Sequence, residues 1–274
     1  MKQSNQHFYT SLARAFGGAI LFAFPVLMTM ETWWLGFYVP RERIGLFLLV
    51  VLPILLGLAH ISGYRYTSRW FEEVVDVFVA TAVGLSTAAL FLWIFGVIDQ
   101  DTPLGHATGQ VTLLSAPCAF GALLASEMLG KQSASNENRQ QGIQGKYYRE
   151  LGIMLAGALY GAFTVSPTAE MYLIAYKMSP WLLFGLAALS LVIMHGFVYG
   201  MSFRGEEQAE PNTSFLRTFF RYTVTGYALA LGMSTYVLWT FERLQGLGFG
   251  TAIMLIIVLG FPAAIGAAAS RLVL

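Results

Sequence analysis

Long uncharged runs separated by short charged segments dominate this chain. Eight such runs lie between charged boundaries, at 15–30, 44–64, 77–98, 102–126, 151–169, 178–203, 222–241 and 244–270. A hydrocarbon core of about 30 Å requires around 20 helical residues, a length that all but the first and fifth runs reach. The runs lack the alternation of apolar and polar residues that a membrane barrel strand needs. The pattern therefore predicts an all-α membrane protein with eight transmembrane helices.

The composition supports a membrane location. Of 274 residues, 56% are hydrophobic and only 11% are charged, and the mean hydropathy is +0.61, whereas a soluble domain carries about 25% charged residues. The net charge of +1 gives no electrostatic basis for binding nucleic acid. The single cysteine, Cys118, excludes intrachain disulfides and cysteine-based metal sites. We expect no cofactor.

Lysine and arginine are distributed unevenly between the two sides that eight spans would define. Twelve lie on the side of the termini and four on the other side, namely Arg41, Arg43, Lys177 and Arg243. Positive charge collects on the cytoplasmic side of membrane proteins. The distribution therefore predicts that both termini are cytoplasmic.

An internal repeat organises the predicted helices. Aligning Glu31 with Glu170 also aligns Gly18-Ala19 with Gly157-Ala158, and Thr29 with Thr168. Further matched pairs follow in the same order: His60 with His195, Gly84-Leu85-Ser86-Thr87 with Gly232-Met233-Ser234-Thr235, and Pro117, Gly121 and Ala122 with Pro262, Gly266 and Ala267. Four blocks in one order indicate a duplicated four-helix unit.

The repeat predicts a domain organisation. The first four-helix repeat occupies 1–130, a polar cytoplasmic linker occupies 131–147, and the second repeat occupies 148–274. An even number of helices in each repeat gives both halves the same orientation, so the two repeats are parallel and a pseudo-twofold axis runs along the membrane normal.

The paired Thr-x-Glu elements carry the main functional hypothesis. Glu31 follows Arg14 by only 16 uncharged residues, which is shorter than the hydrocarbon core at about 1.5 Å per residue. Glu31 and Glu170 are therefore expected at the outer edge of the membrane. Together with Thr29 and Thr168 they offer oxygen ligands to a cation or share a proton. In the alternative interpretation both glutamates simply end their helices in the headgroup layer.

The Gly-x-Ser-Thr elements lie at mid-depth in the third and seventh predicted helices. Small and hydroxyl residues at such positions usually allow close helix packing, with each hydroxyl bonded to the preceding turn. The functional alternative is that Ser86, Thr87, Ser234 and Thr235 line an ion pathway.

Titratable groups collect at the predicted cytoplasmic ends of the helices. His60 and His195 are candidates for a proton relay or pH gate, or are interfacial histidines bonded to a neighbouring helix. A pseudo-twofold axis would bring Glu73 and Asp76 toward two arginines as a gating clamp, although an exposed charged rim is an equal alternative. The two arginines are Arg217 and Arg221.

The segment 14–37, RAFGGAILFAFPVLMTMETWWLGF, resembles the opening motif of an uncharacterised bacterial integral-membrane family, a domain of unknown function. The match is carried mainly by Pro25 to Trp34, and the similarity extends along the chain. The resemblance implies a multi-pass protein of the bacterial inner membrane with the region of Thr29 and Glu31 as a hallmark. It implies no established activity.

These observations predict a cation channel or a cation- or proton-coupled transporter. The bilayer and monovalent or divalent cations or protons are the expected partners, with nucleic acid excluded and a homo-oligomer compatible with the sequence. A non-conducting membrane sensor or assembly subunit is the alternative. A membrane-embedded lipid-modifying enzyme ranks third, because no catalytic or phosphate-binding motif is present.

Overall fold

The computed structural model describes residues 2–62, 70–130, 143–200, 216 and 219–273. All elements within these ranges are helices, and none is a strand. The all-α prediction is therefore confirmed. The contacts divide the chain into two compact units, Met1–Gly142 and Ile143–Val273.

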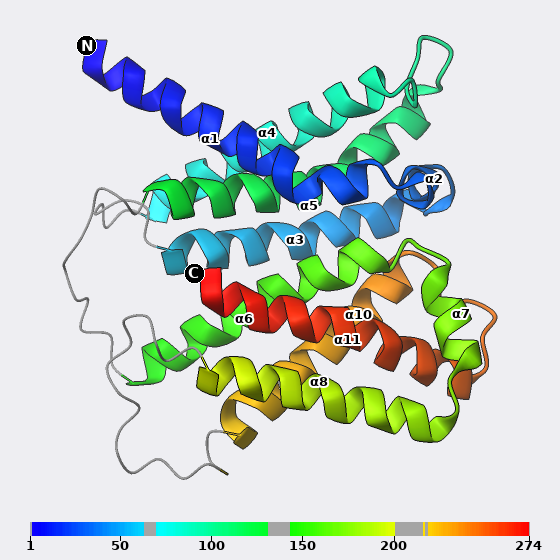
Figure 1. Ribbon diagram of the computed structural model, residues 1–274. Coiled ribbons are helices and arrows are strands. Elements are labelled where there is room, and N and C mark those ends of the chain that lie inside the picture. The colour runs from blue at the N-terminus through cyan, green and yellow to red at the C-terminus, as the bar shows by residue number, and fades with distance from the viewer. Residues whose placement is uncertain (1, 63–69, 131–142, 201–215, 217–218, 274) are drawn as a thin grey trace. The chain divides into compact units, whose positions relative to one another are not determined.

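In the first unit, α5 is the central helix (Figure 1). It packs against α1, α2, α3 and α4. The bounds are α1 Lys2–Leu27, α2 Met30–Tyr38, α3 Arg41–Ser62, α4 Trp70–Ile94 and α5 Leu104–Gly130. Polar residues in the first half of α5 make this run the least hydrophobic of the long runs, yet 78% of its apolar window is buried inside the protein. Of its polar side chains, Gln110 and Ser115 are buried inside the protein, whereas Thr108 is exposed.

The second unit is built around α11, which packs against α6, α7, α8 and α10. The bounds are α6 Ile143–Val165, α7 Glu170–Lys177, α8 Pro180–Gly200, α10 Thr225–Thr240 and α11 Phe249–Val273. A π-helix, η2, occupies Phe219–Val224 and runs directly into α10. In both units a long helix is followed by a short one, α2 or α7, and the last helix is central.

Six helices among the described residues are long and apolar enough to cross a membrane. They contain the spans Tyr9–Leu27, Arg41–His60, Glu73–Ile94, Leu104–Ala125, Pro180–Phe197 and Phe249–Arg271. The number rises to seven if the bent pair Tyr147–Val165 and Glu170–Lys177 is one span. The prediction of eight transmembrane helices is therefore not confirmed, and the coarser prediction of a polytopic helical membrane protein stands.

Two of the eight expected spans do not form an α-helix long enough to cross a membrane, each for a different physical reason. The fifth run was expected to continue to residue 169, but α6 ends at Val165 and the chain bends by 92° into α7. In the seventh run, the α-helical part, α10, has only 16 residues, because the first turns before it are wound as η2. A wider winding changes the helix type without breaking the hydrophobic run.

The first run also differs from its expected bounds of 15–30. Helix α1 ends at Leu27, and α2 begins at Met30 after Thr29, which has an extended conformation (φ −92°, ψ 116°). Figure 1 shows α2 almost end-on beside the end of α1, so the chain turns sharply here. Glu31 therefore lies in the first turn of a separate short helix and not at the end of the first span.

Close glycine contacts join the first and last helices of each unit. A Cβ atom added to Gly18 of α1 would collide with the Gly121 carbonyl of α5. In the second unit, a Cβ atom on Gly157 of α6 would collide with the Gly266 carbonyl of α11. Small residues let helix backbones approach closely in membranes, so these two pairs set the packing distance of the central helix.

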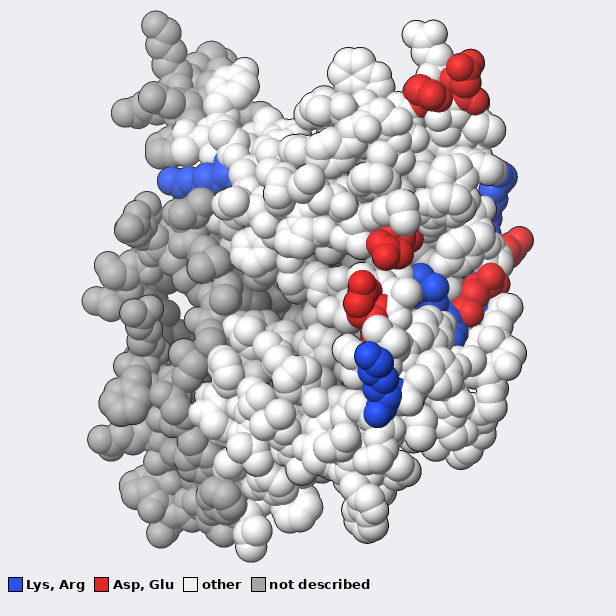
Figure 2. Space-filling model, turned by 45° about the vertical axis from the view of Figure 1, so that its right-hand side comes forward, with Lys and Arg blue, Asp and Glu red and all other residues white. Residues whose placement is uncertain are grey.

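Large apolar side chains cover much of the outer surface. Leu21 is 77% exposed, Phe78 64%, Trp181 83% and Phe184 69%. Figure 2 shows one face on which charged residues are few and the white, uncharged surface is extensive. Exposed apolar surface of this extent is typical of contact with lipid.

Candidate functional site

The break between α1 and α2 positions the first Thr-x-Glu element. The Thr29 hydroxyl donates to the Pro25 carbonyl oxygen at 2.6 Å, and the Trp33 indole N–H donates to the Leu27 carbonyl oxygen at 2.7 Å. Both side chains therefore satisfy carbonyl groups at the end of α1. Glu31 is partly buried, and no hydrogen bond or ion pair to its carboxylate occurs among the described residues.

The break between α6 and α7 is held in a different way. The Thr168 hydroxyl donates to the Val165 carbonyl oxygen at 2.9 Å, and Glu170 is exposed. The Arg243 guanidinium, from the loop between α10 and α11, donates to the Pro167 carbonyl oxygen. The Tyr172 hydroxyl donates back to the Arg243 carbonyl oxygen at 2.7 Å. The positive charge of Arg243 therefore lies beside a carbonyl group of this break.

Replacing Arg243 with glutamine should destabilise the second unit. The change removes a charge-assisted hydrogen bond to a broken helix, a contact that contributes about 1.5–3 kcal/mol. Thermal unfolding of the purified protein in detergent measures the effect. Lys177→Gln, an exposed change on α7, is the control for loss of positive charge. Equal melting temperatures for the two variants would contradict the role of Arg243.

The predicted pathway hydroxyls do not share one environment. Ser86 and Thr235 are exposed, and each donates to the carbonyl oxygen four residues earlier, at 2.7 and 2.8 Å. Ser234 is buried and donates to the Ala230 carbonyl oxygen at 2.8 Å. Thr87 is buried, and its hydroxyl has no hydrogen-bond partner among the described residues. The aligned serines thus lie on different faces, as do the aligned threonines.

The two predicted histidines also have different partners. His60 Nδ1 lies 2.9 Å from a carboxylate oxygen of Glu73, which joins α3 to α4. His195 Nδ1 lies 2.9 Å from the Thr223 hydroxyl of η2, and its ring contacts Phe219 edge to face. The structure thus brings His60 and Glu73 together. Asp76 is partly buried on α4. Arg217 lies outside the described residues, so the clamp of Glu73 and Asp76 with Arg217 and Arg221 stays a prediction.

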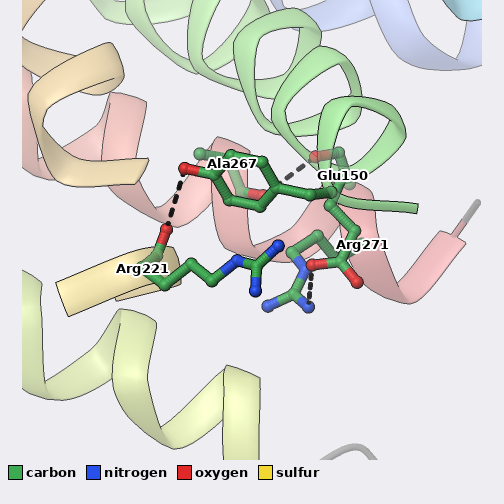
Figure 3. Close-up of polar contacts among 6 residues, drawn as sticks. Glu150, Arg221, Ala267 and Arg271 are labelled. Atoms are coloured by element: carbon green, nitrogen blue, oxygen red, sulfur yellow. Dashed lines mark hydrogen bonds and ion pairs between the residues drawn. The ribbon is translucent and has the colours of Figure 1, made fainter. Parts of the chain in front are cut away.

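A polar cluster forms where α6, η2 and α11 meet (Figure 3). Arg271 on α11 forms an ion pair with Glu150 on α6 at 2.7 Å. The Arg221 guanidinium of η2 lies 4.6 Å from the ring centroid of Tyr147 and 5.7 Å from that of Tyr222. Sequence reasoning named Arg221 but missed the other four residues. The available signal was the mixture of aromatic and basic residues in 146–149 (KYYR) and 219–222 (FFRY).

A partly open hollow of about 240 Å³ lies in the first unit between α2, α3 and α5. Glycines at 36, 105 and 109 lie in its lining, where the missing side chains allow close contacts: a Cβ atom on Gly105 would collide with Arg41, and one on Gly109 with the Gly36 carbonyl oxygen. The other lining residues are Phe37, Val39, Arg41, Ile44, His106, Thr108 and Thr112. None of these lining residues carries a carboxylate.

No group of three or more His, Cys, Asp or Glu side chains within the described ranges is arranged to hold a metal ion.

A family model covers nearly the whole chain. It is described as "Putative integral membrane protein (DUF2391)" and matches residues 11–274. The chain belongs to this family. The resemblance carried by Pro25 to Trp34 is thereby confirmed, and DUF2391 membership agrees with the apolar helices of both units. The chain matches none of the curated proteins and none of the solved structures.

Proposed function

We propose that this DUF2391 protein is a cation channel or a cation- or proton-coupled transporter. One observation carries the proposal: Thr29 with Glu31, and Thr168 with Glu170, both lie at the break between a long helix and a short one. Broken helices in transporters place unwound carbonyl groups and helix ends where ions bind. A carboxylate beside such a break adds the negative charge that a cation requires.

Glu31 is the stronger candidate of the two glutamates. Its carboxylate is partly buried and lacks a described partner, a state that is costly unless a cation or proton compensates the charge. Glu170 is exposed, and Arg243 binds a carbonyl oxygen of its break. We therefore assign cation or proton binding to Glu31, with Thr29 orienting the break, and give Glu170 and Thr168 a smaller role.

The same proposal includes two parallel four-helix repeats, 1–130 and 148–274, joined by the cytoplasmic linker 131–147. The matched glycine pairs support it, since Gly18 meets Gly121 and Gly157 meets Gly266. The common order of a long helix, a short helix and a central last helix supports it as well.

Of the four hydroxyl residues expected to line an ion pathway, only two remain candidates. Any contact with an ion pathway is assigned to Ser86 and Thr235, because these two are exposed. Thr87 and Ser234 are buried within helix packing. The proton-relay proposal likewise narrows to His60 with Glu73, which are bonded to each other.

A non-conducting sensor or assembly subunit is the second candidate. The observation that favours it is that three of the four predicted pathway hydroxyls donate to their own helix. Such hydroxyls contribute to packing and offer only an acceptor to water or ions.

The positive charge distribution supports an orientation with both termini in the cytoplasm of a bacterial inner-membrane protein. Protease added to inside-out vesicles should then cut within 131–147, where Lys131, Arg139 and Lys146 offer trypsin sites. Right-side-out vesicles are the control and should protect that segment. Cleavage there in right-side-out vesicles alone would invert the orientation.

Reconstitution tests the function directly. Purified protein in liposomes should move Na⁺, K⁺ or H⁺ down an imposed gradient faster than empty liposomes do, as followed by an internal fluorescent indicator. Flux equal to that of empty liposomes for all three ions would instead support the non-conducting alternative.

A further inference from the structure

The cluster at α6, η2 and α11 places two arginine side chains in one region. Figure 3 shows the side chains of Arg221 and Arg271 extending toward each other beside Glu150. Arg221 comes from the π-helix, and Arg271 from the end of α11. Single π-helical turns are rare and often occur at functional positions. Here the turn presents an arginine to the helices packed beside it.

Arg221 lacks an anionic partner within the described residues. Its guanidinium lies over the rings of Tyr147 and Tyr222, and the Tyr147 hydroxyl donates to the Arg221 backbone carbonyl oxygen at 3.3 Å. The aromatic rings attract the positive charge through their faces, but they accept no strong hydrogen bonds from it. The N–H groups along the edge of the guanidinium are therefore available to an oxyanion.

Positive charge exceeds negative charge in this cluster. Glu150 pairs with Arg271, whose guanidinium also lies 5.5 Å from the Tyr222 ring centroid. Arg149 is adjacent in sequence, and its Nε atom is buried without a hydrogen-bond partner among the described residues. One carboxylate thus faces the charges of Arg221 and Arg271, with Arg149 close in the chain. A second anion would balance them.

The cluster lies at the ends of two apolar runs, and this position points to the source of that anion. Arg271 is the last residue of the span Phe249–Arg271, and the uncharged run of α6 begins directly after Glu150. Both positions correspond to the boundary between hydrocarbon and headgroups, where tyrosine is enriched. Phospholipid phosphate groups occupy the same depth, and basic pockets between helices bind anionic headgroups.

We propose that Arg221 and Arg271, with the rings of Tyr147 and Tyr222, bind the phosphate of an anionic phospholipid. Guanidinium groups bind phosphate oxygens through paired N–H donors, and this geometry favours arginine over lysine. The site lies in the second unit and is independent of the cation proposal for Glu31.

Native mass spectrometry of the full-length protein in detergent tests the site. The protein is titrated with phosphatidylglycerol, with phosphatidylcholine and with inorganic phosphate. Phosphatidylglycerol should be retained in preference to phosphatidylcholine, and Arg221→Gln should weaken its retention about tenfold, because the change removes the charge-assisted hydrogen bonds to the phosphate. Arg221→Lys should recover only part of the retention, because lysine keeps the charge and loses the planar fork.

Arg14→Gln is the matched control. Arg14 lies on α1 in the first unit, and the described residues give it no aromatic or carboxylate partner, so retention should stay close to that of the wild type. Thermal unfolding in lipid-free detergent checks that Arg221→Gln is folded. Equal losses in Arg14→Gln and Arg221→Gln, or full retention in Arg221→Gln, would overturn the proposal. If inorganic phosphate at equal concentration displaced phosphatidylglycerol, the site would bind free phosphate, and the assignment to a lipid headgroup would be wrong.

Discussion

Leucine at Gly18 should prevent the first unit from folding, whereas leucine at the neighbouring Gly17 should be tolerated. A Cβ atom at Gly18 would collide with the Gly121 carbonyl and the Ala125 side chain, while no atom lies within 4 Å of one at Gly17. Inserting even small groups into packed protein costs about 1–3 kcal/mol, and a leucine against backbone costs more. The total stability of a domain is only about 5–15 kcal/mol.

Size-exclusion chromatography of the two variants in detergent measures the difference. Gly17→Leu should elute as a single symmetric peak, and Gly18→Leu should aggregate or be lost during expression. Gly157→Leu should behave like Gly18→Leu, because Gly157 meets Gly266 in the same way. A folded Gly18→Leu protein with wild-type elution would show that the α1–α5 contact is looser than described.

Glutamine at Glu31 should lower cation flux in liposomes by about tenfold or more. The change preserves the shape of the side chain and removes a charge whose hydrogen bonds or ion contacts contribute about 1.5–3 kcal/mol each. The flux that remains should depend less on pH, since the variant has no carboxylate at this position. Flux measurement with the indicator assay described above gives both quantities.

Two controls separate a cation site from a general loss of negative charge. Glu42→Gln removes an exposed carboxylate from the first turn of α3 and should leave flux unchanged. Glu170→Gln should have a smaller effect than Glu31→Gln, because Glu170 is exposed and Arg243 occupies its break. Equal flux in Glu31→Gln and Glu42→Gln proteins would remove Glu31 from the pathway.

The helical class and the family were predictable because both depend on local sequence. Uncharged runs of about 20 residues predict membrane helices, and the segment from Pro25 to Trp34 indicated the family. Pro25 and Pro167 are local signals for a bend near each helix break, but they do not show that a separate short helix begins after it, because the hydrophobic run continues. Eight spans were expected where six, or seven with the bent pair, are described, because the chain bends after Val165 in the fifth run and the π-helix leaves only 16 α-helical residues in the seventh.

The environments of the candidate site residues were also not predictable from the sequence. Ser86 and Ser234 align in sequence, yet one is exposed and the other buried. Gly84 packs against α5, while Gly232 faces open space. Repeats can preserve residue order while the helices rotate, and sequence alone does not give that rotation. The stacking of Arg221 on Tyr147 joins residues that are 74 positions apart. The only local signal for this contact was that basic and aromatic residues are mixed in both segments.

Cation binding by Glu31 is the central claim, and infrared difference spectroscopy tests it most directly. Adding the transported cation to the purified wild-type protein at constant pH should change carboxylate stretching bands. Glu31→Gln should lack that change, and Glu42→Gln should retain it. An identical difference spectrum in wild-type and Glu31→Gln proteins would contradict the claim.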